Sequence, residues 1–173
     1  MSWICKTLLV CLAFNPVMDY TNNDEFVEQV QACALHLNSM HAESDRVPIN
    51  LIVAQTIHES NWGKSRFAVE GNNLLGIRTF DPADDQLKPL NKPNVSWGLR
   101  IFETKCESIS YYMYLLNNNH HYKQFRKERL LQYFKEIVDL EKLAMTLAIY
   151  AEDIYYTQKI IRTINELEAY DRD

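Results

Sequence analysis

Glycine is scarce in this 173-residue chain, and all four glycines fall in one stretch of it. They are Gly63, Gly71, Gly76 and Gly98, and three of the five prolines lie in the same stretch. Their spacing matches no phosphate-binding loop, dinucleotide motif or nucleophile elbow. Because glycine and proline interrupt regular secondary structure, we expect irregular backbone from about residue 61 to 103 and helices on either side of it.

An excess of positive charge is also missing. The formal net charge is -5, and no basic stripe runs along the sequence, which argues against DNA or RNA as a partner.

The sequence also lacks the patterns of residues that bind metal ions. His58-Glu59 is not followed by the second histidine of a zinc-protease motif, because Trp62 occupies that position. The sequence therefore predicts neither a metal nor another cofactor.

A long apolar run of membrane-spanning length is absent as well. Residues 8–14 are apolar and follow Lys6, a pattern too short to cross a bilayer but typical of a secretory signal. We interpret residues 1–18 as a leader segment and 19–173 as one domain; the alternative is a short N-terminal helix on the core. Cys33 and Cys106 then pair if the protein is exported, or remain as two buried thiols. The predicted location is secreted or periplasmic, without stable membrane insertion.

Hydrophobic periodicity and capping residues predict a mostly helical chain. Pro48 suits a first helical turn, and the expected N-caps are Asp24, Ser65, Thr104 and Asp139. The expected helices cover about residues 24–40, 49–60, 104–117, 139–150 and 155–167. Residues 73–80 and 95–102 are apolar-rich and suit the two strands of a hairpin. The fold class is therefore α+β, with a small β-hairpin inserted between helices. Such a chain forms two lobes, and a cleft between them suits an extended substrate.

The expected helix at 49–60 presents a carboxyl group at its C-terminal end. Ile49, Val53 and Ile57 form a stripe that should face the core. Glu59 lies away from that stripe, on a half-polar face that it shares with Gln55. On spacing alone, this is also what an ordinary surface glutamate near a helix end looks like.

The position of Glu59 favours a raised pKa. The C-terminal end of a helix carries partial negative charge, which disfavours an ionised carboxylate. The neighbouring Trp62 should add desolvation, which acts in the same direction. A glycosidase needs such a carboxyl group, because its general acid must hold a proton near neutral pH.

Two runs of sequence resemble a known family. Residues 59–68 (ESNWGKSRFA) and 70–77 (EGNNLLGI) are similar to the signature of bacterial and phage glucosaminidases, of the flagellar-rod and Bax types, in glycoside hydrolase family 73. The family pattern is E-S-x-W-G-x-S followed by G-N-N-L-F-G-I, and Leu75 replaces its phenylalanine. The resemblance continues more weakly at 101–104, 122–126 and 150–153, and it covers roughly residues 47–167.

This resemblance implies a lysozyme-like two-lobed fold and an enzyme, an endo-β-N-acetylglucosaminidase that hydrolyses β-1,4 bonds of peptidoglycan. It places the general acid at Glu59 and a cleft-facing tyrosine at Tyr150. The implied partner is the glycan strand, bound by a monomer.

The remaining candidates for the site are less specific. Trp62 is expected either to stack on a sugar or to form a wall beside Glu59. Asn72 and Asn73 are expected to bind acetamido groups or to hold the turn. Glycosidases also need a second group, often a carboxylate. Asp81 is our candidate, together with Asp84 and Asp85 of the same loop.

Three alternatives stay open from the sequence. A lytic transglycosylase or a muramidase has the same fold, although residues 71–76 differ from the turn typical of transglycosylases. A non-catalytic cell-wall-binding module is the third. A phage lysis enzyme and a bacterial autolysin both suit a chain of this size.

Overall fold

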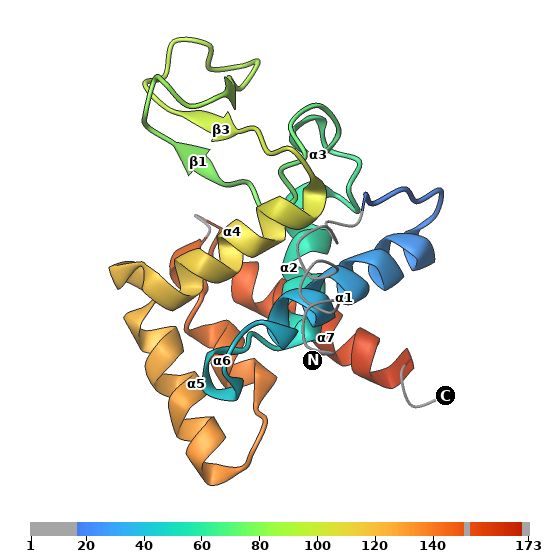
Figure 1. Cartoon of the computed structure of the whole chain (residues 1–173), viewed down its shortest axis with the longest axis vertical. Helices are drawn as coiled ribbons and strands as arrows, with labels where there is room; N and C mark the ends of the chain where they lie inside the picture. The colour runs from blue at the N-terminus through green and yellow to red at the C-terminus, as the bar shows by residue number, and fades with distance from the viewer. Residues whose placement is uncertain (1–16, 151–152, 171–173) are drawn as a thin grey trace, which may run out of the picture.

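The computed structural model describes residues 17–150 and 153–170, so almost all of the proposed leader lies outside the described residues. Helices form most of the molecule, and a small sheet stands at one end of it (Figure 1). The α-helices are α1 (Asn23–Ser39), α2 (Ile49–Ser60), α3 (Arg66–Glu70), α4 (Lys105–Asn118), α5 (Lys123–Lys135), α6 (Leu140–Met145) and α7 (Tyr156–Tyr170). Short 3-10 helices are η1 (Glu43–Asp45), η2 (His120–Tyr122) and η3 (Ala148–Tyr150).

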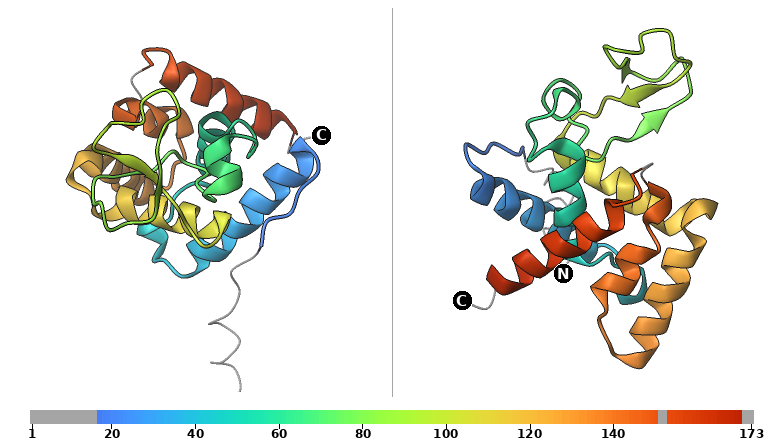
Figure 2. Two further views of the ribbon diagram at one scale, coloured as in Figure 1. Left: turned by 90° about the horizontal axis from the view of Figure 1, so that it is seen from above. Right: turned by 180° about the vertical axis from the view of Figure 1, so that it is seen from behind.

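The predicted helix at 49–60 is confirmed residue for residue as α2, which packs between α1 and α7 (Figures 1 and 2). The expectation of a half-polar face was wrong, because Gln55 and Thr56 are both fully buried. The reason is α7, which covers that face and brings the Tyr156 hydroxyl to 2.8 Å from the Gln55 side-chain nitrogen. Glu59 therefore belongs to a central helix rather than to a surface one.

The capping residues mark most helix starts as the sequence predicted. Ser65, Thr104 and Asp139 each accept a hydrogen bond from a backbone N–H in the first turn that follows. The exception is α1, where Asn22 rather than Asp24 is the N-cap and accepts from the Glu25 N–H at 2.9 Å.

The sheet contains the predicted hairpin and one further strand. β1 (Arg78–Thr79) and β2 (Gln86–Leu87) both pair antiparallel with β3 (Gly98–Arg100), in the order β1-β3-β2. The sequence prediction missed β2, because two residues are too few to show an alternating pattern. Lys88 stabilises the loop between β2 and β3, because its ammonium group donates to the Val95 and Trp97 carbonyls at 3.2 and 2.9 Å.

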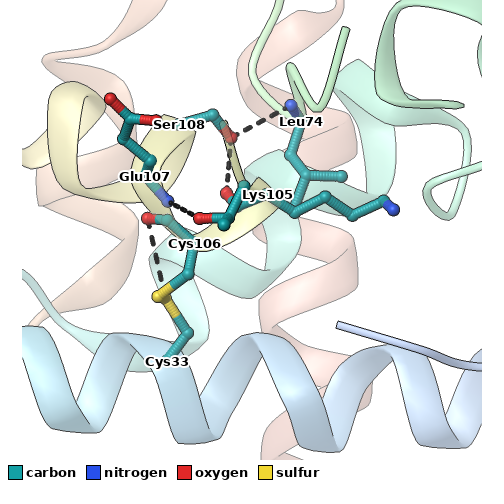
Figure 3. Close-up of a disulfide and its surroundings, with 7 residues drawn as sticks. Cys33, Leu74, Lys105, Cys106, Glu107 and Ser108 are labelled. Carbon is teal, nitrogen blue, oxygen red and sulfur yellow. Dashed lines mark hydrogen bonds between the residues drawn. A yellow bond between two sulfur atoms is a disulfide. The ribbon is translucent and has the colours of Figure 1, made fainter. Parts of the chain in front are cut away.

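A disulfide joins Cys33 of α1 to Cys106 of α4, with 5.9 Å between the two Cα atoms (Figure 3). The sequence left open whether these two cysteines are paired or remain free thiols, and in the structure they are paired. Two residues along α4, the Ser108 hydroxyl accepts from the Leu74 N–H at 3.2 Å. The cross-linked helix pair thus contacts the loop that follows α3. Among the described residues, none of the helices has the length and apolar character that a bilayer span requires.

Candidate active site

A groove of about 610 Å³ runs between the sheet and the helices, with Glu59 in its wall. The sheet side contributes Gly76, Ile77 and Arg78, and the helical side contributes the rest. Those others are Leu115, Tyr122, Ile149, Tyr150 and Asp153. The cleft expected between two lobes is therefore present, and of the predicted site residues it brings together Glu59 and Tyr150.

The Glu59 carboxyl group lies in the last turn of α2, which ends where Asn61 adopts a left-handed conformation. Burial raises the pKa of Glu59 from 4.5 to about 7. A hydrogen bond from Tyr156 and the positive charge of Arg78 act in the opposite direction, and burial outweighs them. Close to neutral pH the group is therefore about half protonated, as a proton donor requires.

The backbone at Gly76 passes close to this carboxyl group. Gly76 has a φ of +61°, and a Cβ atom built there would lie 3.4 Å from the Glu59 Oε2 atom. A side chain at this position would be strained by the backbone conformation, and its Cβ atom would be in van der Waals contact with the acid. Glycine thus lets the loop close over Glu59.

Asn73 holds that loop in place from inside. Its side-chain nitrogen donates to the Ile77 and Arg100 carbonyls at 2.9 and 2.8 Å. Its side-chain oxygen accepts from the Ile77 N–H at 2.9 Å, and the residue is 1 % exposed. Asn73 therefore acts on the shape of the groove from behind and does not line it.

Four tyrosines cluster behind and beside Glu59: Tyr112, Tyr122, Tyr150 and Tyr156. The Tyr150 hydroxyl, which the sequence placed in the cleft, donates to the Leu75 carbonyl at 2.6 Å. Tyr150 thus lines the groove, but its hydroxyl proton is already used in a hydrogen bond to the backbone. Burial raises the pKa of Tyr122, and the nearby Glu59 charge adds to this effect.

Trp62 and Asn72 lie outside the groove. The Trp62 ring meets the Phe26 ring at a steep angle, with 6.3 Å between centroids, and lines a separate cavity between α1 and α7. The Asn72 side chain donates to the Phe102 and Glu103 carbonyls, both at 3.0 Å. Trp62, from which we expected desolvation of Glu59, therefore does not line the groove in whose wall Glu59 lies.

The acids of the hairpin loop also lie outside the groove. Asp81 is exposed and accepts from the Ala83 N–H at 2.9 Å, which closes a turn. Asp84 pairs with Arg100 at 3.2 Å. Asp153 belongs to a segment of weaker resemblance and was not among the candidate acids. It does line the groove, but its carboxylate is paired with Lys159 at 2.6 Å.

Sequence reasoning missed three groups around the acid: Arg78, Tyr122 and Tyr156. The Arg78 guanidinium stacks over the Trp97 ring at 4.3 Å, and its charge reaches Glu59. Tyr122 lies in one of the segments of weaker resemblance, which was the only available signal for it. No cluster of three or more metal-ligating side chains occurs among the described residues.

The two-lobed fold and the groove with its protonatable carboxyl group are the architecture of the lysozyme-like class of glycoside hydrolases. Residues 36–169 match the sequence model of the family described as mannosyl-glycoprotein endo-beta-N-acetylglucosaminidase. This match spans well over half of the chain, which therefore belongs to that glucosaminidase family. The resemblance found in the sequence is confirmed.

Individual relatives agree with this assignment. Protein bax of Escherichia coli (strain K12) is 30% identical over 92 residues, which are 53% of this chain and 32% of that protein. This chain thus matches about a third of the length of its curated relative. The glycoside hydrolase domain of FlgJ from Salmonella typhimurium has a TM-score of 0.63 at 21% identity, covering 88% of this chain and 92% of that one. A peptidoglycan hydrolase from Sphingomonas sp. A1 has a TM-score of 0.60 at 22% identity, covering 83% and 88%.

Proposed function

We propose that this protein is an endo-β-N-acetylglucosaminidase that cleaves peptidoglycan, with Glu59 as its general acid. The observation that carries the proposal is a carboxyl group with a pKa of about 7 in the wall of a groove between two lobes. Family membership supports the glucosaminidase reaction, and the Sphingomonas structural relative, a peptidoglycan hydrolase, supports the substrate. The disulfide between Cys33 and Cys106 supports action outside the cytoplasm, where disulfides persist.

The chemistry assigned to Glu59 is the first step of glycoside hydrolysis. The protonated carboxyl group donates its proton to the glycosidic oxygen while the bond to the anomeric carbon breaks. Positive charge then develops on the sugar, and the departing glycan end leaves as an alcohol. Asp81 is the sequence candidate for the second group, but it stands outside the groove, so we assign no step to it. Trp62, Asn72 and Asn73 receive structural roles for the same reason.

Substitution of Glu59 by Gln tests the assignment of the acid. We expect Glu59→Gln to lower the rate of peptidoglycan solubilisation by at least about 100-fold, because the amide cannot supply a proton. Glu103→Gln is the matched control, since Glu103 is exposed and does not line the groove. Equal clearing by native protein and Glu59→Gln would remove Glu59 from the mechanism. A native protein that binds walls without cleaving them would support the binding module instead.

The identity of the bond is read from the products. Mass spectrometry of digested peptidoglycan should show fragments that end in reducing N-acetylglucosamine. Fragments that end in reducing N-acetylmuramic acid would indicate a muramidase. An anhydromuramic product would indicate a lytic transglycosylase, because that class closes the ring in place of adding water.

A further inference from the structure

A chain of three buried polar side chains leads from the interior of the protein to Glu59. Tyr112 of α4 and Gln55 of α2 are 0 % exposed, and Tyr156 at the start of α7 is 5 % exposed. The Tyr112 hydroxyl donates to the side-chain oxygen of Gln55. The side-chain nitrogen of Gln55 donates to the Tyr156 hydroxyl oxygen at 2.8 Å. The Tyr156 hydroxyl in turn lies near enough to the Glu59 carboxyl group to lower its pKa.

The direction of each hydrogen bond in this chain follows from the orientation of the Gln55 amide. An amide has a donor end and an acceptor end, and its oxygen is occupied by the Tyr112 proton. The amide nitrogen must therefore face Tyr156 as a donor. The Tyr156 hydroxyl has a single proton, which is left free to point at the Glu59 carboxyl group. Buried chains of this kind polarise each bond and hold one arrangement.

The surrounding packing fixes where Tyr156 lies. Gln55 and Glu59 are four residues apart on α2, so both side chains lie on the face that α7 covers. The Tyr150 ring stacks almost parallel to the Tyr156 ring, with 6.1 Å between centroids and 14° between planes. Tyr150 is not an alternative donor, because its proton is used by the Leu75 carbonyl.

We propose that Tyr156, oriented by Gln55 and Tyr112, is a positioning residue that holds one oxygen of Glu59 and so leaves the acidic proton on the oxygen that faces the groove. The proposal rests on the proposed function, since it describes how the acid of that reaction is held. A carboxylic acid has one carbonyl oxygen and one hydroxyl. Occupying the carbonyl oxygen from behind aims the hydroxyl at the substrate, and the same bond strengthens when Glu59 becomes a carboxylate.

The kinetic effect follows from the timing of this stabilisation. Because the hydrogen bond gains strength only as the proton leaves Glu59, its loss acts on the transition state more than on substrate binding. We expect Tyr156→Phe to lower kcat about 10- to 100-fold, the range for a hydrogen bond to a charged group. KM should change less than about twofold. Tyr155→Phe is the matched control, because Tyr155 is the adjacent tyrosine and is 58% exposed.

The pH profile separates this role from a merely structural one. The Tyr156 hydrogen bond lowers the pKa of Glu59, so its removal should raise that pKa and move the alkaline limb of kcat to higher pH. Gln55→Met should shift the limb in the same direction, since Tyr156 then loses the partner that orients it. A fall in kcat with an unmoved alkaline limb, or a rise in KM alone, would overturn the proposal.

A measurement without substrate keeps the test independent of the proposed function. The carbon-13 shift of the Glu59 carboxyl group, titrated between about pH 4 and 9, reports its protonation directly. A higher midpoint in Tyr156→Phe and an unchanged midpoint in Tyr155→Phe support the positioning role. An unchanged midpoint in folded Tyr156→Phe refutes it. If the native protein cleaves no peptidoglycan, the proposed function fails while this titration still decides the role of Tyr156.

Discussion

Glu59 should destabilise the folded protein at neutral and alkaline pH. Its pKa is about 7 in the folded state against an ordinary 4.5, so the folded state holds a proton that the unfolded chain has already lost. Each tenfold difference in proton affinity corresponds to about 1.4 kcal/mol. The stability present below pH 4.5 therefore falls by about 3 kcal/mol as the pH rises through 7. Glu59→Gln removes the charge while keeping the shape, and it should abolish this loss.

Urea denaturation of native protein and Glu59→Gln at about pH 4, 6 and 8 measures the effect. The two proteins should have similar unfolding free energies at pH 4, where the carboxyl group is protonated in both states. At pH 8 the variant should be more stable by up to about 3 kcal/mol. Glu103→Gln, on the exposed surface, should show no such pH-dependent gain. Equal stabilities at pH 8, or a gain that grows toward acid pH, would refute the assignment of a buried, proton-holding Glu59.

Three further outcomes are expected. The kcat of peptidoglycan cleavage should fall about tenfold per pH unit above pH 7, measured as release of reducing ends, because only protonated Glu59 donates. The double substitution Cys33→Ser with Cys106→Ser opens a loop of 73 residues and should lower the unfolding free energy by about 4 kcal/mol, with no further loss on adding reductant. Tyr122→Phe should lower kcat/KM about fivefold without lowering Tm, because the Tyr122 hydroxyl lines the groove and has no hydrogen-bond partner among the described residues.

Much of the helical framework could be predicted from the sequence, because its signals are local. Pro48 marks the start of α2, and Ser65, Thr104 and Asp139 mark the starts of α3, α4 and α6. Each of these residues acts within one helical turn of its own position. The start of such a helix can therefore be predicted without knowledge of what packs against it.

The surroundings of Glu59 could not be predicted in the same way. The half-polar appearance of α2 depends on Gln55, which is buried between Tyr112 of α4 and Tyr156, a residue from the far end of the chain. Periodicity shows which residues share a face and leaves open what covers that face. Asn72 and Asn73 were misjudged in another way, because polar residues in a glycine-rich turn suggest sugar binding. In the structure their amides satisfy backbone groups of the sheet and loop.

The features that raise the pKa of Glu59 form one connected unit with the disulfide. The bond between Cys33 and Cys106 fixes α4 to α1, and α4 carries both Tyr112 and Ser108. The Ser108 hydroxyl accepts from the Leu74 N–H, and the carbonyl of the next residue, Leu75, accepts the Tyr150 proton. This loop continues directly into Gly76, whose backbone lies against the acid. Burying a carboxyl group without a full counter-charge is unfavourable, so the enclosing elements must resist local opening. The disulfide links α4, which lines the groove through Leu115, to α1, which packs against the helix that carries Glu59, and it thereby opposes such opening.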